Sequence, residues 1–162
     1  MTRYEELARL GVEHSKQFYA MRNECMAFAA TLMQRLSEFL EAPKDNIVYV
    51  DILPNLKFGQ RQASVWLSAP TMTHGSDGFW YFGVEFFFQV PDSVNYGRQL
   101  SLFGLKKQGD LFVLRHGKDS QIHRNDNKAI QDFCESMYAD IKAFYEGPVG
   151  EPPRRIGFVL AE

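Results

Sequence analysis

The stretch FWYFGVEFFFQV, residues 79–90, decides how this chain folds, because it reads as one central β-strand with two unlike faces. Successive side chains of a strand point to opposite sides of the sheet. On one side they form an unbroken apolar row: Trp80, Phe82, Val84, Phe86, Phe88 and Val90. Such a row requires a core, so we predict that helices cover this side of the sheet.

The other side of the same strand mixes aromatic residues with Gly83, Glu85 and Gln89. It is too polar for an ordinary core and too aromatic for an ordinary wet surface, and exposed aromatic groups often mark binding surfaces. We therefore expect a partner chain, or a second copy of this one, to contact a patch made of Tyr49, Trp66, Phe79, Tyr81, Glu85 and Phe87. Two alternatives remain open: a second core layer within one chain, and a pocket for an apolar ligand.

The N-terminal segment has the apolar period of an α-helix, with spacings of three and four from Leu7 to Phe39. Thr2 and Glu5 match the capping-box pattern and Pro43 stops the element, so we predict a helix over residues 1–42. A helix of that length is about 60 Å long, against about 40 Å for the central strand. Either Gly11 breaks it or part of it overhangs the sheet.

The rest of the chain predicts an antiparallel sheet followed by a second helix. Alternating or turn-bounded segments at 47–53, 63–68, 99–107, 111–116 and 120–124 join residues 79–90 in a meander of about five or six strands over residues 46–124. Asn125 to Gly147-Pro148 carries the start and stop signals of a helix over residues 126–147. The tail, residues 148–162, contains an apolar segment that reads as an edge strand.

We thus predict one α+β domain over residues 1–162, with a long N-terminal helix, an antiparallel sheet, a C-terminal helix on the same sheet face and a short tail strand. A net charge of −2 gives no overall attraction to nucleic acid or anionic membrane. We find no signal-peptide pattern and no apolar run of about 18 residues. Cys25 and Cys134 read as buried thiols of a reducing compartment, so we expect a cytoplasmic protein; a disulfide between the two helices is the alternative.

One segment is locally basic. Residues 106–128 hold more lysines and arginines than acids, and Arg115-His116 and His123-Arg124 flank one tight turn. We predict that they meet across a hairpin as an anion or acidic-partner site made of Arg115, His116, Lys118, His123 and Arg124. The alternative is a solvated edge that discourages aggregation.

Catalytic signatures are weak. His74 stands near Ser76 and Asp77 in one turn, but triad residues are seldom neighbours in sequence, and Asp51 with Glu85 would need a cleft. No phosphate-binding, nucleophile-elbow or metal-ligand motif is present in the sequence. We expect no catalytic residue, no metal and no cofactor.

These patterns favour a small non-enzymatic protein-binding module of the adaptor, inhibitor, immunity-protein or chaperone type, acting as a homodimer through the sheet face or the basic hairpin. The first alternative is a ligand-binding or enzymatic domain with a pocket between helices and sheet, using Arg115, His116 and His123 as polar groups. The second alternative is a nucleic-acid accessory factor.

Overall fold

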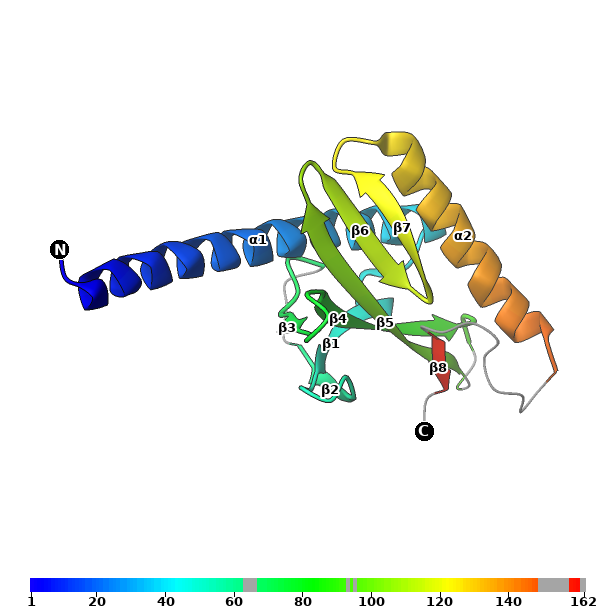
Figure 1. The fold of residues 1–162 in the computed structure, drawn as a ribbon. Coiled ribbons are helices and arrows are strands. Elements are labelled where there is room, and N and C mark those ends of the chain that lie inside the picture. The colour runs from blue at the N-terminus through cyan, green and yellow to red at the C-terminus, as the bar shows by residue number, and fades with distance from the viewer. Residues whose placement is uncertain (63–66, 93, 95, 149–157, 161–162) are drawn as a thin grey trace.

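The fold was obtained as a computed structural model, which describes residues 1–62, 67–92, 94, 96–148 and 158–160. It confirms the predicted α+β class, with a helix at each end of an antiparallel sheet (Figure 1). The elements in chain order are α1 (Arg3–Leu40), the short 3-10 helix η1 (Lys44–Asn46), β1 (Ile47–Ile52), β2 (Phe58–Arg61), β3 (Thr73–His74), β4 (Trp80–Gln89), β5 (Tyr96–Gln108), β6 (Leu111–His116), β7 (Lys118–His123), α2 (Asn127–Glu146) and β8 (Phe158–Leu160).

The sheet has eight strands in the described part of the chain, ordered β2-β1-β4-β5-β6-β7, with β3 beside β4 and β8 beside β5. The central strand β4 pairs with β5 along its whole length, from Trp80 opposite Leu105 to Gln89 opposite Tyr96. Gly109 and Gly117 have φ of +60° and +82° in the tight turns that follow β5 and β6. Left-handed backbone of this kind favours glycine and allows the strands to fold back as a meander.

Both helices cover one face of the sheet, as predicted from the apolar row of β4. Sheet residues Phe82, Val84 and Phe86 are fully buried there, together with side chains of α1 and α2. The helix residues of this core include Cys25, Phe28, Leu32, Leu36, Ile130, Cys134 and Met137. Val90 ends the predicted row but lies beyond β4, and it is exposed. We call the sheet face opposite the helices the open face.

α1 is one continuous helix of 38 residues, and Gly11 does not break it. The capping box between Thr2 and Glu5 is present. Every residue from 1 to 17 is exposed, and Phe18 is the first residue of α1 to contact the core. Only the second half of α1 therefore packs on the sheet. The N-terminal half therefore projects beyond the sheet, as Figure 1 shows on the left.

Two strands lie in segments for which no strand was predicted. β2 and β3 fall in the segments around Gly59 and from Pro70 to Gly78, and both are short edge strands held by ladders to β1 and β4. The strand predicted at 63–68 falls mostly on residues outside the described part of the chain. The tail strand is confirmed as β8, which pairs with residues Gln99 to Ser101 of β5.

Cys25 and Cys134 are free and buried, one in each helix. Burial raises the pKa of each thiol to about 11. A raised pKa keeps a thiol protonated and unreactive at neutral pH. Neither described helix is apolar enough over a sufficient length to cross a lipid bilayer.

Candidate interaction surfaces

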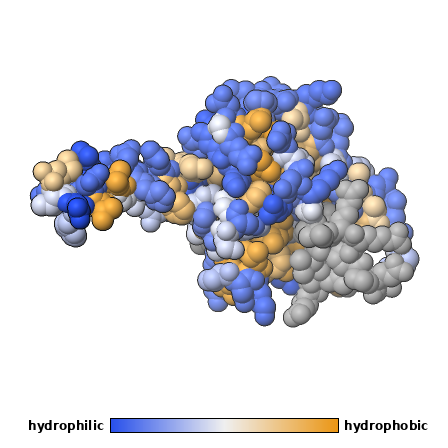
Figure 2. All heavy atoms as spheres, in the orientation of Figure 1, coloured by the Kyte–Doolittle hydropathy of each residue, from blue (hydrophilic) through white to orange (hydrophobic). Residues whose placement is uncertain are grey.

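The first candidate surface is the N-terminal half of α1, which we call the projecting helix and define as residues 3–17. Its large apolar side chains face solvent, with Tyr4 80%, Leu7 68% and Leu10 57% exposed. Apolar atoms are visible along this part of the helix in Figure 2. These side chains continue the apolar stripe that contacts the core at Phe18 and Cys25. The projecting helix therefore carries an apolar stripe like that of the buried half, but exposed to solvent.

Apolar and charged residues are largely separated around the projecting helix, although Arg3 falls on the apolar side and Val12 falls beside the charged residues. At about 100° per residue, Glu5, Arg9, Glu13 and Lys16 lie on one side, and Tyr4, Leu7, Leu10 and Gly11 lie on the other. The charges of both signs are mixed on the polar side. This separation is typical of a helix that is covered on one side and wet on the other.

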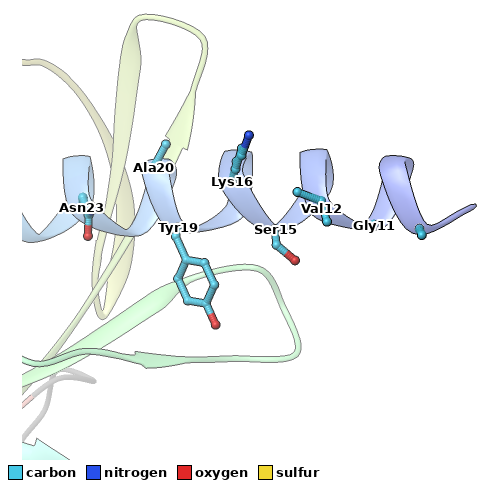
Figure 3. Close-up of a pocket in the computed structure, with 8 residues that line it drawn as sticks. Gly11, Val12, Ser15, Lys16, Tyr19, Ala20 and Asn23 are labelled. Atoms are coloured by element: carbon cyan, nitrogen blue, oxygen red, sulfur yellow. The ribbon is translucent and has the colours of Figure 1, made fainter. Parts of the chain in front are cut away.

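A shallow hollow lies along the projecting helix beside Gly11 (Figure 3). The small residues Ala8, Gly11, Ser15 and Ala20 line it together with the larger Val12, Lys16, Tyr19 and Asn23. In Figure 3, Ser15 and Tyr19 point to the same side of the helix, whereas Lys16 points to the other. A Cβ atom added to Gly11 would meet no atom within 4 Å, so nothing in its own chain requires glycine there.

The second candidate surface is the open face of the sheet, whose centre is Glu85. This carboxylate is only 1% exposed. Arg61 donates to Oε1 at 2.7 Å and Arg98 donates to Oε2 at 2.6 Å, so both oxygens are paired. The Arg61 guanidinium also lies over the ring of Phe87, at 4.5 Å from its centroid. Glu85 therefore belongs to a closed ion-pair cluster on the open face.

Beside this cluster, Phe79 and Tyr81 form a second small core with Ile52 and Val113. Tyr81 is only 5% exposed. The expected open aromatic patch is therefore mostly closed within one chain, because these side chains cover one another. Phe87 is half-buried, and Trp66 lies outside the described residues. A partner that contacts Tyr81 or Glu85 would first have to uncover them.

The position of Tyr49 differs from the predicted one. It lies opposite Val84 in the pairing of β1 with β4, and directly paired residues share a face of the sheet. Val84 belongs to the row under the helices, so Tyr49 is fully buried in the main core. Burial raises the pKa of its hydroxyl. Our placement of Tyr49 on the open face was wrong, because the alternation within β1 does not say which of its sides matches β4.

A network of hydrogen bonds and ion pairs lies at one edge of the open face. The Tyr81 hydroxyl donates to Asp77 at 2.5 Å, and Arg115 bonds to Asp77 at 2.8 Å and to Asp119 at 2.8 Å. The guanidinium of Arg115 also stacks on Phe79, at 3.7 Å from the ring centroid.

The network lowers the pKa of both carboxyls. The Arg115 hydrogen bonds hold the pKa of Asp119 below its usual range. Burial acts to raise the pKa of Asp77, but bonds from the Tyr81 hydroxyl and the Phe79 N–H, with the Arg115 charge, outweigh it and lower that pKa. Arg115 thus has two carboxylate partners of its own and is a poor anchor for an outside anion.

The predicted anion site is not assembled. Arg115 pairs with Asp119 and His116 with Lys118 beside the turn, whereas His123 pairs with Leu111 at the far end of the hairpin. His116 stacks on Phe103, at 4.5 Å between ring centroids, on the helix side. Arg124 lies near Glu24, which Lys107 also contacts. The prediction that Arg115-His116 and His123-Arg124 meet was wrong, because a hairpin with six-residue strands keeps its two ends apart.

Hollows border the helix layer. One, about 480 Å³, lies between the C-terminal ends of α1 and α2 and the end of β4. Its lining is mostly apolar and includes Phe88, Tyr138, Ile141 and Tyr145. Another, about 260 Å³, lies between α2 and the β6–β7 hairpin and is more polar, with His116, Asp132 and Ser136.

The weak catalytic candidates do not form a site. The His74 ring packs on Trp80 and Phe18, at 4.5 Å and 5.0 Å between centroids, and Asp77 bonds to Tyr81 and Arg115. His14 is exposed on the projecting helix. Among the residues that the structure describes, no group of three or more His, Cys, Asp or Glu side chains is placed to hold a metal ion.

Comparison with known proteins identifies no relative. No family model, curated protein or solved structure matches this chain. The residues that sequence reasoning missed are Tyr4 and Val12 on the projecting helix, and Arg61 and Arg98 around Glu85. The helical period at the N-terminus places Tyr4 on the same side as Leu7 and so contained a signal for it, but it places Val12 away from that side. Arg61 and Arg98 depend on strand register.

Proposed function

We propose that this chain is a non-enzymatic protein-binding module whose projecting helix docks on a partner protein. The observation that supports it is the continuity of α1. One apolar stripe runs along the helix, is buried from Cys25 to Leu36, and is exposed from Tyr4 to Leu10. An adaptor, inhibitor, immunity protein or chaperone acting in the cytoplasm would all work by such binding.

The energetics favour a protein partner. Full burial of a leucine side chain contributes about 1.5–3 kcal/mol, so Leu7 and Leu10 alone offer a gain that the free chain does not realise. An amphipathic helix laid into a groove is a recurring mode of recognition, with anchors at helical spacing. Tyr4, Leu7 and Leu10 have that spacing, and the charged side of the helix would remain in water.

The open face supports this role less well than the projecting helix. Its aromatic residues Phe79 and Tyr81 are buried within one chain, and Glu85 is already paired with Arg61 and Arg98. Uncovering them would break an ion-pair cluster and a small core. We therefore place the principal binding surface on the helix, with half-buried Phe87 as a residue of the open face that a partner can reach.

The proposal is tested by affinity capture with the full chain as bait. The variant Leu7→Glu with Leu10→Glu places two charges on the apolar side, and we expect it to lose the captured partner. The matched control, Ala20→Glu with Asn23→Glu, adds the same charge on the polar side of the helix, where both residues are exposed, and should retain the partner. Circular dichroism checks that both variants remain helical. A partner captured equally by both variants would contradict the proposal.

A second candidate function is the binding of an apolar ligand in the hollow of about 480 Å³ between the helix ends. Its size and apolar lining are those of many small-molecule sites. Thermal-shift measurements with apolar ligands on the wild type and on Ile141→Trp, which narrows the hollow, would test it. Stabilisation of the wild type that the variant lacks would favour a ligand-binding domain.

A further inference from the structure

The strand β5 is longer than the strand that follows it, so part of its backbone edge extends past β6. β5 has 13 residues, and β6 pairs with the last five, Gly104 to Gln108. We call the first eight residues, 96–103, the β5 edge. β4 pairs with one side of these residues. In the described part of the chain, the only strand on their other side is β8, which pairs with Gln99 to Ser101 (Figure 1).

Two polar side chains of the β5 edge are buried without a hydrogen-bond partner. Gln99 is 2% exposed and Ser101 is 0% exposed. Neither the amide of Gln99 nor the hydroxyl of Ser101 bonds to another group among the described residues. Both lie on the helix side of the sheet, because they pair opposite Phe86 and Val84 of the main core. A polar group buried in this way loses its bonds to water and gains none in return.

β8 brings no partner for either group. Its register places Leu160 opposite Gln99 and Phe158 opposite Ser101, and the side chains of leucine and phenylalanine contain no hydrogen-bonding atom. β8 also pairs with β5 through three residues only. A strand of this length gains few backbone hydrogen bonds, so β8 is a short and poorly matched occupant of the β5 edge.

We propose that the β5 edge is a strand-accepting site, at which an extended segment of a partner protein displaces β8. Addition of a strand to a sheet edge is a recurring mode of recognition, in which backbone hydrogen bonds give affinity and alternate side chains give specificity. The partner segment carries Ser, Thr, Asn or Gln opposite Gln99 and Ser101, where these side chains supply the missing hydrogen bonds. The residue between them lies opposite half-buried Leu100, on the open face, and is apolar.

The unpaired groups make the site selective. A site with buried polar groups rejects a segment that cannot bond them, because those groups then remain unpaired. β8 occupies the site in spite of its poor match because residues 147–157 join it to α2, which gives it a high effective concentration there. A free segment must therefore bind better than β8, and its polar side chains provide that advantage. The site is separate from the projecting helix and goes beyond the proposed function.

Two synthetic peptides test the site on the full chain. The first has the sequence of residues 155–162, and the second has the same sequence with Phe158→Thr and Leu160→Asn. We expect the second peptide to bind several-fold more tightly, because it brings a hydroxyl and an amide to the two unpaired groups. Fluorescence polarisation of the labelled peptides measures both affinities.

A third peptide and an opened chain separate recognition from access. The third peptide has Val159→Thr alone, which places its hydroxyl opposite Leu100, and it should bind no better than the first. The full chain with Phe158→Pro and Val159→Pro has a weakened β8, because successive N–H groups of a strand point to opposite sides and one proline removes a donor aimed at β5. All three peptides should bind this chain more tightly than the wild type, in the same order.

Matched variants of the protein locate the recognition. Gln99→Leu with Ser101→Ala removes both unpaired groups, so the preference for the second peptide should disappear. This variant should melt at or above the wild-type temperature, because no polar group is then left unpaired. The control, Gln121→Leu with Ser120→Ala, removes the same groups from β7, where both residues are exposed, and should keep the preference.

Three outcomes would overturn the proposal. Failure of every peptide to bind the chain with Phe158→Pro and Val159→Pro would show that the β5 edge accepts no added strand. Equal affinities of the first two peptides, or a preference that survives Gln99→Leu with Ser101→Ala, would exclude recognition by these groups. A melting temperature of that variant well below the wild type would show that bound water already pairs them. The peptides should bind unchanged to the charged variant of the projecting helix, so this site and the proposed function are tested separately.

Discussion

At the residue scale, Glu85 shows how one buried carboxylate organises a surface. An unpaired buried charge is costly, and here Arg61 and Arg98 occupy both of its oxygens. Both arginine side chains are more exposed than that of Glu85. Each arginine can therefore be solvated when Glu85 is removed, whereas Glu85 stays buried when an arginine is removed. The asymmetry predicts which substitutions the protein tolerates.

We expect Arg98→Ala to destabilise the fold by about 2–3 kcal/mol, because it leaves Glu85 buried with one partner. In a Glu85→Gln background the same change should cost less than about 1 kcal/mol, since no charge is then left unpaired. Urea unfolding of the wild type, both single variants and the double variant measures the coupling. Equal effects of Arg98→Ala in the two backgrounds would refute the ion-pair account.

The Arg115 network predicts a pH dependence. The pKa values of Asp77 and Asp119 are lowered in the folded chain, so their contribution is complete above the unfolded values, near pH 4, and disappears as pH falls through the folded values. The groups are partly exposed, so solvent screening keeps the effect small. We expect Arg115→Gln to melt a few degrees below the wild type at pH 7 and at nearly the same temperature at pH 2. A difference independent of pH would assign the effect to packing on Phe79 alone.

At the element scale, β4 and α1 each place their side chains in two different environments. The even positions of β4 face the main core, and the odd positions face the second core and the Glu85 cluster. α1 buries one half of its length and projects the other. In both elements the sequence period marks the apolar side, but the neighbours determine whether that side is covered.

Tyr81 and Phe87 lie on the open face of β4, and the stability of the fold should respond differently to a charged residue at each position. Tyr81→Lys is expected to cost roughly 3 kcal/mol or more, because Tyr81 is part of the second core and bonds to Asp77. Phe87→Lys is expected to cost less, since Phe87 is half-buried beside Arg61. Thermal unfolding followed by circular dichroism compares the two. A Tyr81→Lys variant as stable as the wild type would restore the view that this side of β4 is an open interface.

At the scale of the whole molecule, the helix layer and the sheet form one body with a shared core, and the projecting helix lies outside it. Cys25 of α1 and Cys134 of α2 belong to the same core cluster. Their pKa values are raised to about 11, so few thiolates are present at neutral pH even when a thiol is briefly reached.

Thiol labelling should therefore report the opening of the body. We expect Cys25 and Cys134 to react slowly and at similar rates at pH 8, because each requires the helix layer to separate from the sheet. Mild urea should accelerate both in parallel. Mass spectrometry of peptides from partly labelled protein measures the two rates, with a fully unfolded sample as the reference. Rapid labelling of Cys134 alone would indicate that α2 opens independently.

The sequence by itself determined the elements whose signals are local. The period of α1, its capping box, the apolar row of β4 and the stops of α2 are all read within a few residues, because side-chain direction repeats along one helix or strand. The separation of Arg115 from His123 was also available, since counting outward from Gly117 places them at opposite ends of the hairpin.

Only the tertiary structure decided what depends on pairing between distant segments. β2 and β3 are too short to show a period and exist through their ladders to β1 and β4. The face of Tyr49 follows from its position opposite Val84, and a shift of one residue would reverse it. The arginines of Glu85 come from β2 and β5, which the register brings to one point. Register is a long-range property, so no local pattern in the sequence could specify it.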